Sequence, residues 1–88
     1  MASSAQGKVQ AFVLVEAKAG EVLNAGQQIA KIEGVIASYA VTGPFDVIVH
    51  VEADDIRSLG QLVVAKIQAL SNVSRTLTCV VVESSEDG

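Results

Sequence analysis

One stretch of this 88-residue chain is repeated in its other half. Ile29, Ile32, Gly34 and Val35 recur, in the same order and at the same spacing, as Ile67, Leu70, Asn72 and Val73. Upstream, the sequence Val-Leu-Val-Glu-Ala of residues 13–17 is echoed by Val-His-Val-Glu-Ala of residues 49–53. Each copy has the pattern of a strand, a helix and a strand. Two such units favour a small module that pairs with copies of itself, rather than an enzyme.

The composition limits both the core and the partners. Half of the residues are hydrophobic but only 3% are aromatic, so the core must consist of Val, Ile, Leu and Ala. A single core in so short a chain rarely supplies more than ~3–5 kcal/mol, which makes help from association reasonable. The net charge is −4 and the six cations are scattered. Direct binding of nucleic acid, which needs clustered cations, is therefore not expected.

The remaining global signals exclude several classes of protein. The single cysteine, Cys79, rules out an intrachain disulfide and a CxxC site, and it is expected to be a buried thiol in a strand. No apolar run is long enough for a membrane span, and no basic, apolar leader is visible at the start. We expect a cytoplasmic protein with no membrane partner, no cofactor and no metal site.

Residues 9–83 are expected to form one domain, between a flexible arm over 1–8 and an acidic, disordered tail over 84–88. Runs of β-branched residues predict four strands, over Val9–Ala17, Val35–Val41, Asp46–Ala53 and Thr76–Glu83. Helical spacing of apolar residues predicts one helix from Gly20 to Gly34 and another beginning at Asp54 and Asp55. The order βαββαβ predicts the α+β, ferredoxin-like fold, with a four-stranded antiparallel sheet and both helices on one face.

Three details of the helices follow from the same patterns. Gly34 is expected to end the first helix in the left-handed conformation, and Asn72 is expected to do the same for the second. The buried stripe of the second helix is expected to be Ile56, Leu59, Val63, Ile67 and Leu70.

Both faces of the predicted sheet are apolar. In the first strand Val13 and Val15 point to one face, and Phe12 and Leu14 point to the other. The third and fourth strands repeat this pattern, with Ile48, Leu77, Cys79 and Val81 on the second face. Two helices can cover only one face, and large exposed apolar patches usually mark an interface. We therefore expect sheet-to-sheet dimerisation, which gives a dimeric α+β barrel.

Four short motifs resemble the effector-binding (RAM) domain of the Lrp/AsnC family over residues 9–83. They are Ile32-Glu33-Gly34-Val35, Val41-Thr42-Gly43-Pro44-Phe45-Asp46, Val51-Glu52-Ala53-Asp54 and Val73-Ser74-Arg75-Thr76-Leu77-Thr78. Each motif is weak alone, but all four in order are fairly specific. Pro44 departs from the family, in which an acidic residue is frequent at this turn.

The resemblance implies a homodimer that assembles further into an octamer or a decamer and binds an amino acid or related small metabolite near the contacts between dimers. Most family members carry an N-terminal DNA-binding domain. Because only about eight residues precede the first strand here, the chain is expected to be a stand-alone version. It would then modulate transcription or metabolism through its assembly state or by mixing with full-length Lrp/AsnC regulators.

Candidate ligand-binding residues fall into three groups, each with a structural alternative. An amino acid offers a carboxylate and an ammonium, which loop N–H groups and the side chains of Thr42 and Asp46 could meet; alternatively, the loop is only a hairpin turn in which Asp46 bonds local backbone. Thr76 and Thr78 beside Arg75 could contact a ligand, or could be ordinary strand threonines. Tyr39 could line a pocket or belong to the core. The full set is Tyr39, Thr42, Gly43, Pro44, Phe45, Asp46, Thr76 and Thr78.

Other functions are less well supported by the residues. The one histidine, His50, has too few partners for catalysis or metal binding and is expected at an interface or surface. The alternative to a binding module is a dimeric α+β barrel enzyme, of a monooxygenase or isomerase type, which would need a polar cluster inside the barrel. A third possibility is an amino-acid-sensing ACT-type domain, but the Thr-Gly-x-x-Asp turn argues against it. No catalytic residue is assigned.

Overall fold

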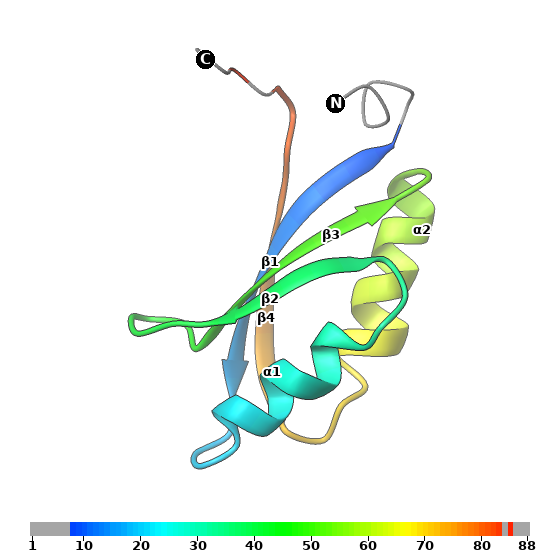
Figure 1. Ribbon diagram of the computed structural model, residues 1–88. Helices are drawn as coiled ribbons and strands as arrows, with labels where there is room; N and C mark the ends of the chain where they lie inside the picture. Colours follow the sequence, from blue (N-terminus) through cyan, green and yellow to red (C-terminus); the bar gives the residue numbers. More distant parts are fainter. Residues whose placement is uncertain (1–7, 84, 86–88) are drawn as a thin grey trace.

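A computed structural model describes residues 8–83 and 85 (Figure 1). Apart from Lys8 and Ser85, the expected arm and tail lie outside the described residues. The elements are β1 (Val9–Ala17), α1 (Val22–Ala30), β2 (Val35–Ala40), β3 (Val47–Ala53), α2 (Ile56–Gln61), η2 (Leu62–Ile67) and β4 (Val73–Val80). The predicted order of strands and helices is confirmed. The first helix is shorter than predicted, since it ends at Ala30 and not at Gly34. The last strand begins earlier than expected, because Val73 already pairs with Ala17 of β1, and it also ends earlier, at Val80.

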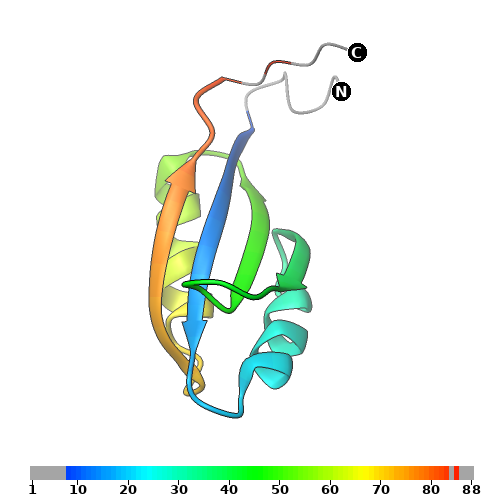
Figure 2. The ribbon, with the colours of Figure 1, turned by 90° about the vertical axis from the view of Figure 1, so that its left-hand side faces the viewer.

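The four strands form one antiparallel sheet in the order β2-β3-β1-β4. The ferredoxin-like arrangement is therefore confirmed. Both helices lie behind the sheet when its other face is viewed, as in Figure 2. We call this uncovered side the open face. It carries the even-numbered residues of β1 and β3, including Phe12, Leu14, Ile48 and His50, with Tyr39 of β2 and Leu77 and Cys79 of β4.

The core lies between the sheet and the helices. It is built from the odd-numbered residues of β1 and β3, with one helical residue from α1 and four from α2 and η2 packed on them. Its fully buried large side chains are Val13, Val15, Ile29, Val47, Val49, Val51 and Ile67. Because aromatic rings are absent from this set, many small β-branched contacts hold the layers together.

The second helix buries Leu59, Val63 and Ile67 as predicted, and its last turn is π-helical. The backbone N–H of Gln68 donates to the carbonyl oxygen of Val63, five residues earlier. The wider turn brings both Leu62 and Val63 into the core. Ile56, expected in the buried stripe, is 59% exposed, so that prediction is wrong. Leu70 lies beyond the helix, partly buried against the core.

Two further single-residue predictions are corrected. Among the described residues only glycines have a positive φ, so Asn72 is not left-handed as Gly34 is (φ +98°). Asn72 is instead buried, with its carbonyl oxygen accepting from the N–H of Lys18. Its side chain also reaches Gln28 of α1, so Asn72 joins two loops and a helix. Cys79 is exposed in the single chain, because it lies on the open face.

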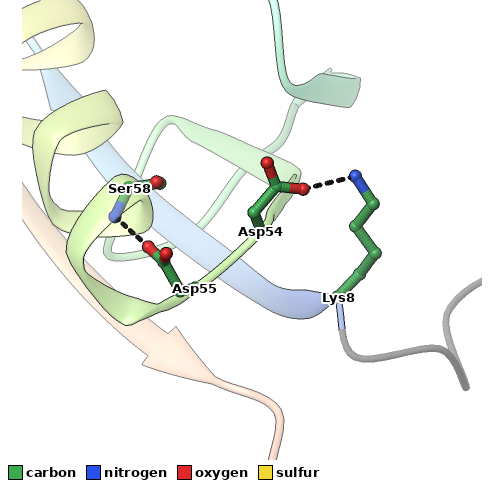
Figure 3. Close-up of polar contacts among 4 residues, drawn as sticks. All are labelled: Lys8, Asp54, Asp55 and Ser58. Atoms are coloured by element: carbon green, nitrogen blue, oxygen red, sulfur yellow. Dashed lines mark hydrogen bonds and ion pairs between the residues drawn. The ribbon is translucent and has the colours of Figure 1, made fainter.

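The start of α2 is fixed by two carboxylates (Figure 3). Asp55 caps the helix by accepting from the N–H of Ser58 at 2.7 Å, as the sequence predicts. This hydrogen bond lowers the pKa of Asp55. Asp54 pairs with Lys8 at 2.6 Å, which raises the pKa of Lys8. The ion pair joins the beginning of β1 to the turn between β3 and α2.

No helix in the described part of the chain is long and apolar enough to cross a membrane.

Leu62 of the second helix lies very close to Gly34, and this contact allows a test of how the helices pack on the sheet. A Cβ on Gly34 would lie 2.5 Å from Leu62 Cδ1 and 3.3 Å from the carbonyl oxygen of Glu52. Gly34→Ala should therefore lower the free energy of unfolding by about 1–3 kcal/mol in urea titrations, through backbone strain and displacement of Leu62. Gly20→Ala is the matched control, because Gly20 also has a positive φ (+80°) but has open space around it. Equal losses in the two variants would contradict this account.

Candidate functional site

The loop between β2 and β3, residues 41–46, is anchored by Asp46. Its N–H donates to the carbonyl oxygen of Val15 at 2.9 Å, and its own carbonyl accepts from the N–H of Val41 at 2.9 Å. The Asp46 side chain accepts from the N–H of Ala17 at 2.9 Å, two residues beyond Val15, which makes the last pair of β1 with β3. The carboxylate therefore satisfies a backbone donor that lies past the end of this ladder. The structural alternative predicted that Asp46 bonds local backbone; its side chain does bond a backbone group, but that group lies 29 residues away in the chain.

The tip of the loop is accessible. Thr42, Gly43 and Pro44 are exposed, and Gly43 has a φ of +149°, which favours glycine. Figure 2 shows the loop crossing in front of β1, on the open face. The loop is therefore anchored at Asp46 and exposed at its tip.

Arg75 connects this loop to β4. Its guanidinium lies over the ring of Phe45, 5.3 Å from the centroid. Its Nε is 3.4 Å from Oε1 of Glu16, the cross-strand neighbour on β1. The Arg75 side chain is 65% exposed and that of Glu16 is 41% exposed. An ion pair this accessible is worth about 0–1 kcal/mol, so a ligand can displace it at little cost.

Thr76 and Thr78 lie on the helix side of β4, opposite Val15 and Val13 of β1. Thr76 is partly buried and its Oγ1 accepts from Nε2 of Gln68 at 2.7 Å. A hollow of about 390 Å³ opens beside this hydrogen bond, lined by Gln68, Val73, Ser74, Arg75 and Thr76. Thr78 is exposed further along the same strand face.

The predicted site residues therefore divide between two edges of the sheet. Phe45 of the loop meets Arg75, and Arg75 also lines the hollow that contains Thr76. Tyr39 lies on β2, which is the other edge strand, and it is exposed on the open face. Within one copy of the chain, two strands separate Tyr39 from Thr76 and Thr78.

The open face itself is apolar at its centre. Leu14 lies between Ile48 and Leu77 in one cross-strand row, and Tyr39 extends the row beyond Ile48. Leu77 is 51% exposed and Phe12 is 39% exposed. In the next row His50 stacks on Phe12, with ring centroids 4.7 Å apart, and its Nε2 lies 2.8 Å from Oε1 of Gln10. The expected second apolar face is therefore present, and the helices of the same chain leave it uncovered.

Two residues of the site were missed or undervalued by the sequence analysis. Gln68 was not considered, because only the π-helical turn brings it to Thr76. Arg75 was noted as a neighbour of the two threonines, but its contact with Phe45 depends on the path of a loop about thirty residues earlier. The one signal for this site in the sequence was the cation Arg75 directly before the Thr76-Leu77-Thr78 motif.

A second hollow, of about 540 Å³, lies at the opposite end of the sheet. Lys8, Glu33, Glu52 and Asp54 are its charged lining residues. Lys8 and Asp54 already pair there. Within the residues that the structure describes, no group of three or more His, Cys, Asp or Glu side chains is arranged to hold a metal ion.

The role of Asp46 as an anchor can be tested separately from ligand binding. Asp46→Ala leaves the N–H of Ala17 without its partner, and it should lower the free energy of unfolding by about 1–3 kcal/mol in urea titrations. Asp46→Asn, which keeps an oxygen acceptor, should retain most of the stability. An Asp46→Ala variant as stable as the wild type would refute the anchoring role.

Comparison with known proteins places this arrangement in a family. The model of the Lrp/AsnC ligand binding domain matches residues 10–88. An uncharacterized HTH-type transcriptional regulator of Pyrococcus furiosus is 35% identical over 54 residues, which cover 61% of this chain and 36% of the regulator. The matched part thus spans about a third of the length of that curated relative.

Solved structures agree in fold. The crystal structure of TTHA0845 from Thermus thermophilus has a TM-score of 0.85 and 32% identity, and it covers 90% of this chain and 99% of that one. The transcriptional regulator NMB0573 of Neisseria meningitidis, solved as a complex with L-Met, has a TM-score of 0.83 at 19% identity, covering 99% of this chain and 58% of that one. The second likeness concerns the fold alone. Because the family model matches almost the whole chain, this protein belongs to the Lrp/AsnC ligand-binding domain family.

Proposed function

We propose that this domain binds a free amino acid or a related small metabolite at a junction between copies of the chain. Binding changes the assembly and thereby regulates transcription or metabolism. The observation that carries the proposal is the uncovered apolar face, with an anchored, accessible loop and Arg75 at one end of it. The family description and the L-Met complex of the Neisseria relative support the class of ligand.

A second copy is the occupant that best fits the open face. Its central row, Tyr39, Ile48, Leu14 and Leu77, is a continuous apolar strip flanked by Phe12 and His50. Fully burying one large apolar side chain contributes about 1.5–3 kcal/mol, so a few of these residues repay the cost of association. Two copies related by a two-fold axis would present identical strips to each other.

The candidate ligand groups lie at the margin of that strip, not at its centre. The loop tip and Arg75 remain accessible at one end of the sheet, and Thr76 lies beside Arg75 on the helix side of β4. A ligand held there touches the edge of the assembly, where a neighbouring copy can complete its surroundings. Such a ligand shifts the assembly only if it binds one arrangement more tightly than another.

The ligand class can be tested with a thermal-shift panel of the twenty amino acids, with light scattering of the same samples. A ligand at ~100 times its dissociation constant should add about 2.7 kcal/mol per site, which raises the melting temperature by several degrees in so small a domain. We expect at least one amino acid to raise it and to change the scattering. If no amino acid changes either quantity, the proposed function is wrong.

The assembly surface can be tested with charge substitutions on two faces. Leu77→Glu places a carboxylate in the central row of the open face and should reduce the mass in sedimentation equilibrium to that of a single chain. Leu23→Glu is the matched control, because Leu23 is exposed on α1, outside the open face. The control should keep at least the dimer mass. A Leu77→Glu protein with unchanged mass would rule out assembly through this face.

A further inference from the structure

His50 lies at the centre of the open face. It belongs to β3, one of the two central strands, and its cross-strand neighbours are Phe12 of β1 and Ala37 of β2. This row and the row of Leu14 and Ile48 are the two inner rows of the face. A second copy that covers the open face therefore covers His50. The ring is only half-buried in the single chain, so it still has contact with water to lose.

The contacts of the His50 ring within the chain suit its neutral form. Its Nε2 lies 2.8 Å from Oε1 of Gln10, and because this oxygen can only accept, Nε2 carries the hydrogen. The ring also stacks on Phe12, with the centroids 4.7 Å apart and the planes inclined by 16°. Among the residues that the structure describes, no acceptor is hydrogen-bonded to Nδ1. A proton taken up at Nδ1 would therefore create a donor without a partner in the chain.

The titratable groups that face His50 come from the neighbouring strands. On β3 itself Glu52 lies two residues further along the same face, opposite Gln10 of β1. From β2 comes the phenol of Tyr39, in the next row, and from β4 the thiol of Cys79, beyond Phe12. Phenols and thiols are ordinarily neutral between about pH 5 and 7.5. Two ion pairs lie towards the ends of β1, Lys8 with Asp54 and Glu16 with Arg75.

Covering the open face changes the surroundings of the ring in one main respect. Gln10 and Phe12 belong to the same chain as His50, so both contacts exist before and after a second copy arrives. The water around the ring is replaced by the apolar strip of the partner, and this loss disfavours the charged imidazolium. Glu52 acts in the opposite sense, because a carboxylate favours a neighbouring cation. We expect the loss of water to dominate, since the desolvation of an ion pair commonly exceeds its mutual attraction.

We propose that His50 makes the assembly through the open face sensitive to pH, so that copies associate while the ring is neutral and separate as it takes up a proton, below about pH 6.5. The separated chains then bind more protons than the assembly, and a fall in pH favours dissociation. This inference rests on the proposed function, because a second copy must cover the open face. It adds acidity to the ligand as a second signal that changes the assembly.

The test measures the dissociation constant of the full chain by sedimentation equilibrium from about pH 8 to about pH 5.5, a range in which carboxylates ordinarily keep their charge. If the assembly disfavours the charged ring about ten-fold at each of two histidines, the dissociation constant should rise roughly ten- to hundred-fold as the pH falls across this range. His50→Gln is the matched variant, because its side chain can still donate to Gln10 but takes up no proton. Its dissociation constant should stay the same throughout.

A second measurement needs no variant. His50 is the only histidine of the chain, so the histidine ring signals in proton NMR report this one residue. At about pH 6, dilution of the wild-type protein should separate the copies and move these signals towards the positions of the charged ring. Signals that stay in place while sedimentation shows dissociation overturn the inference. If His50→Gln does not fold, this dilution experiment decides.

The outcomes separate this inference from the proposed function. A dissociation constant that does not change with pH, or one that rises equally in His50→Gln, overturns the inference and leaves assembly through the open face intact. An assembly that tightens as the pH falls shows that Glu52 outweighs the loss of water, and it overturns the inference as well. A single-chain mass at about pH 8 at every concentration contradicts the proposed assembly itself, and both proposals then fail.

Discussion

The arrangement of this domain depends on a mismatch between its sheet and its helices. The strands carry apolar side chains on both faces, but α1, α2 and η2 together cover one face only. On the covered side Val13, Val49 and Ile67 form a closely packed layer, and on the other side Leu14, Ile48 and Leu77 remain in contact with water in the single chain. In a chain of this size the covered layer gives a modest stability, so the uncovered layer is the largest remaining source of favourable free energy. We propose that association of copies of the chain buries this uncovered layer.

The same mismatch limits where the proposed ligand could bind. A site at the centre of the open face would compete with the partner for the apolar strip, whereas a site at its margin can influence the partner without replacing it. The loop of residues 41–46, held by Asp46, and the guanidinium of Arg75 meet at such a margin. The hollow around Thr76 lies on the other side of the same strand, β4.

The sequence predicted the elements well and the site only in part, for identifiable physical reasons. Alternation of apolar residues along β1 and β3 depends only on local geometry, so the two faces of the sheet were predictable, and Asp55 carried a recognisable signal for the start of a helix. Gly34 has the positive φ that was predicted, but α1 already ends at Ala30. The π-helical turn carries no such signal, because it results from packing; it places Leu62 beside Val63 in the core and brings Gln68 to Thr76. Asn72 was expected in a left-handed turn and is instead buried between loops, a contact that tertiary structure decides. The contacts of Phe45 with Arg75 and of Asp46 with Ala17 join distant segments, so no local pattern contained them.

The most direct test of the central claim is the mass of the wild-type protein in solution, measured by sedimentation equilibrium over a wide range of concentrations without any ligand. If a second copy covers the open face, the mass should be at least twice that of the single chain at micromolar concentration, and exchange of the backbone amides should be slow in the central strands β1 and β3. A single-chain mass across the whole range, with Cys79 reacting as fast with a thiol reagent as it does in the unfolded chain, would contradict the account. The open face would then be exposed to water in solution. No junction between copies would exist, and the proposed ligand could not bind at one.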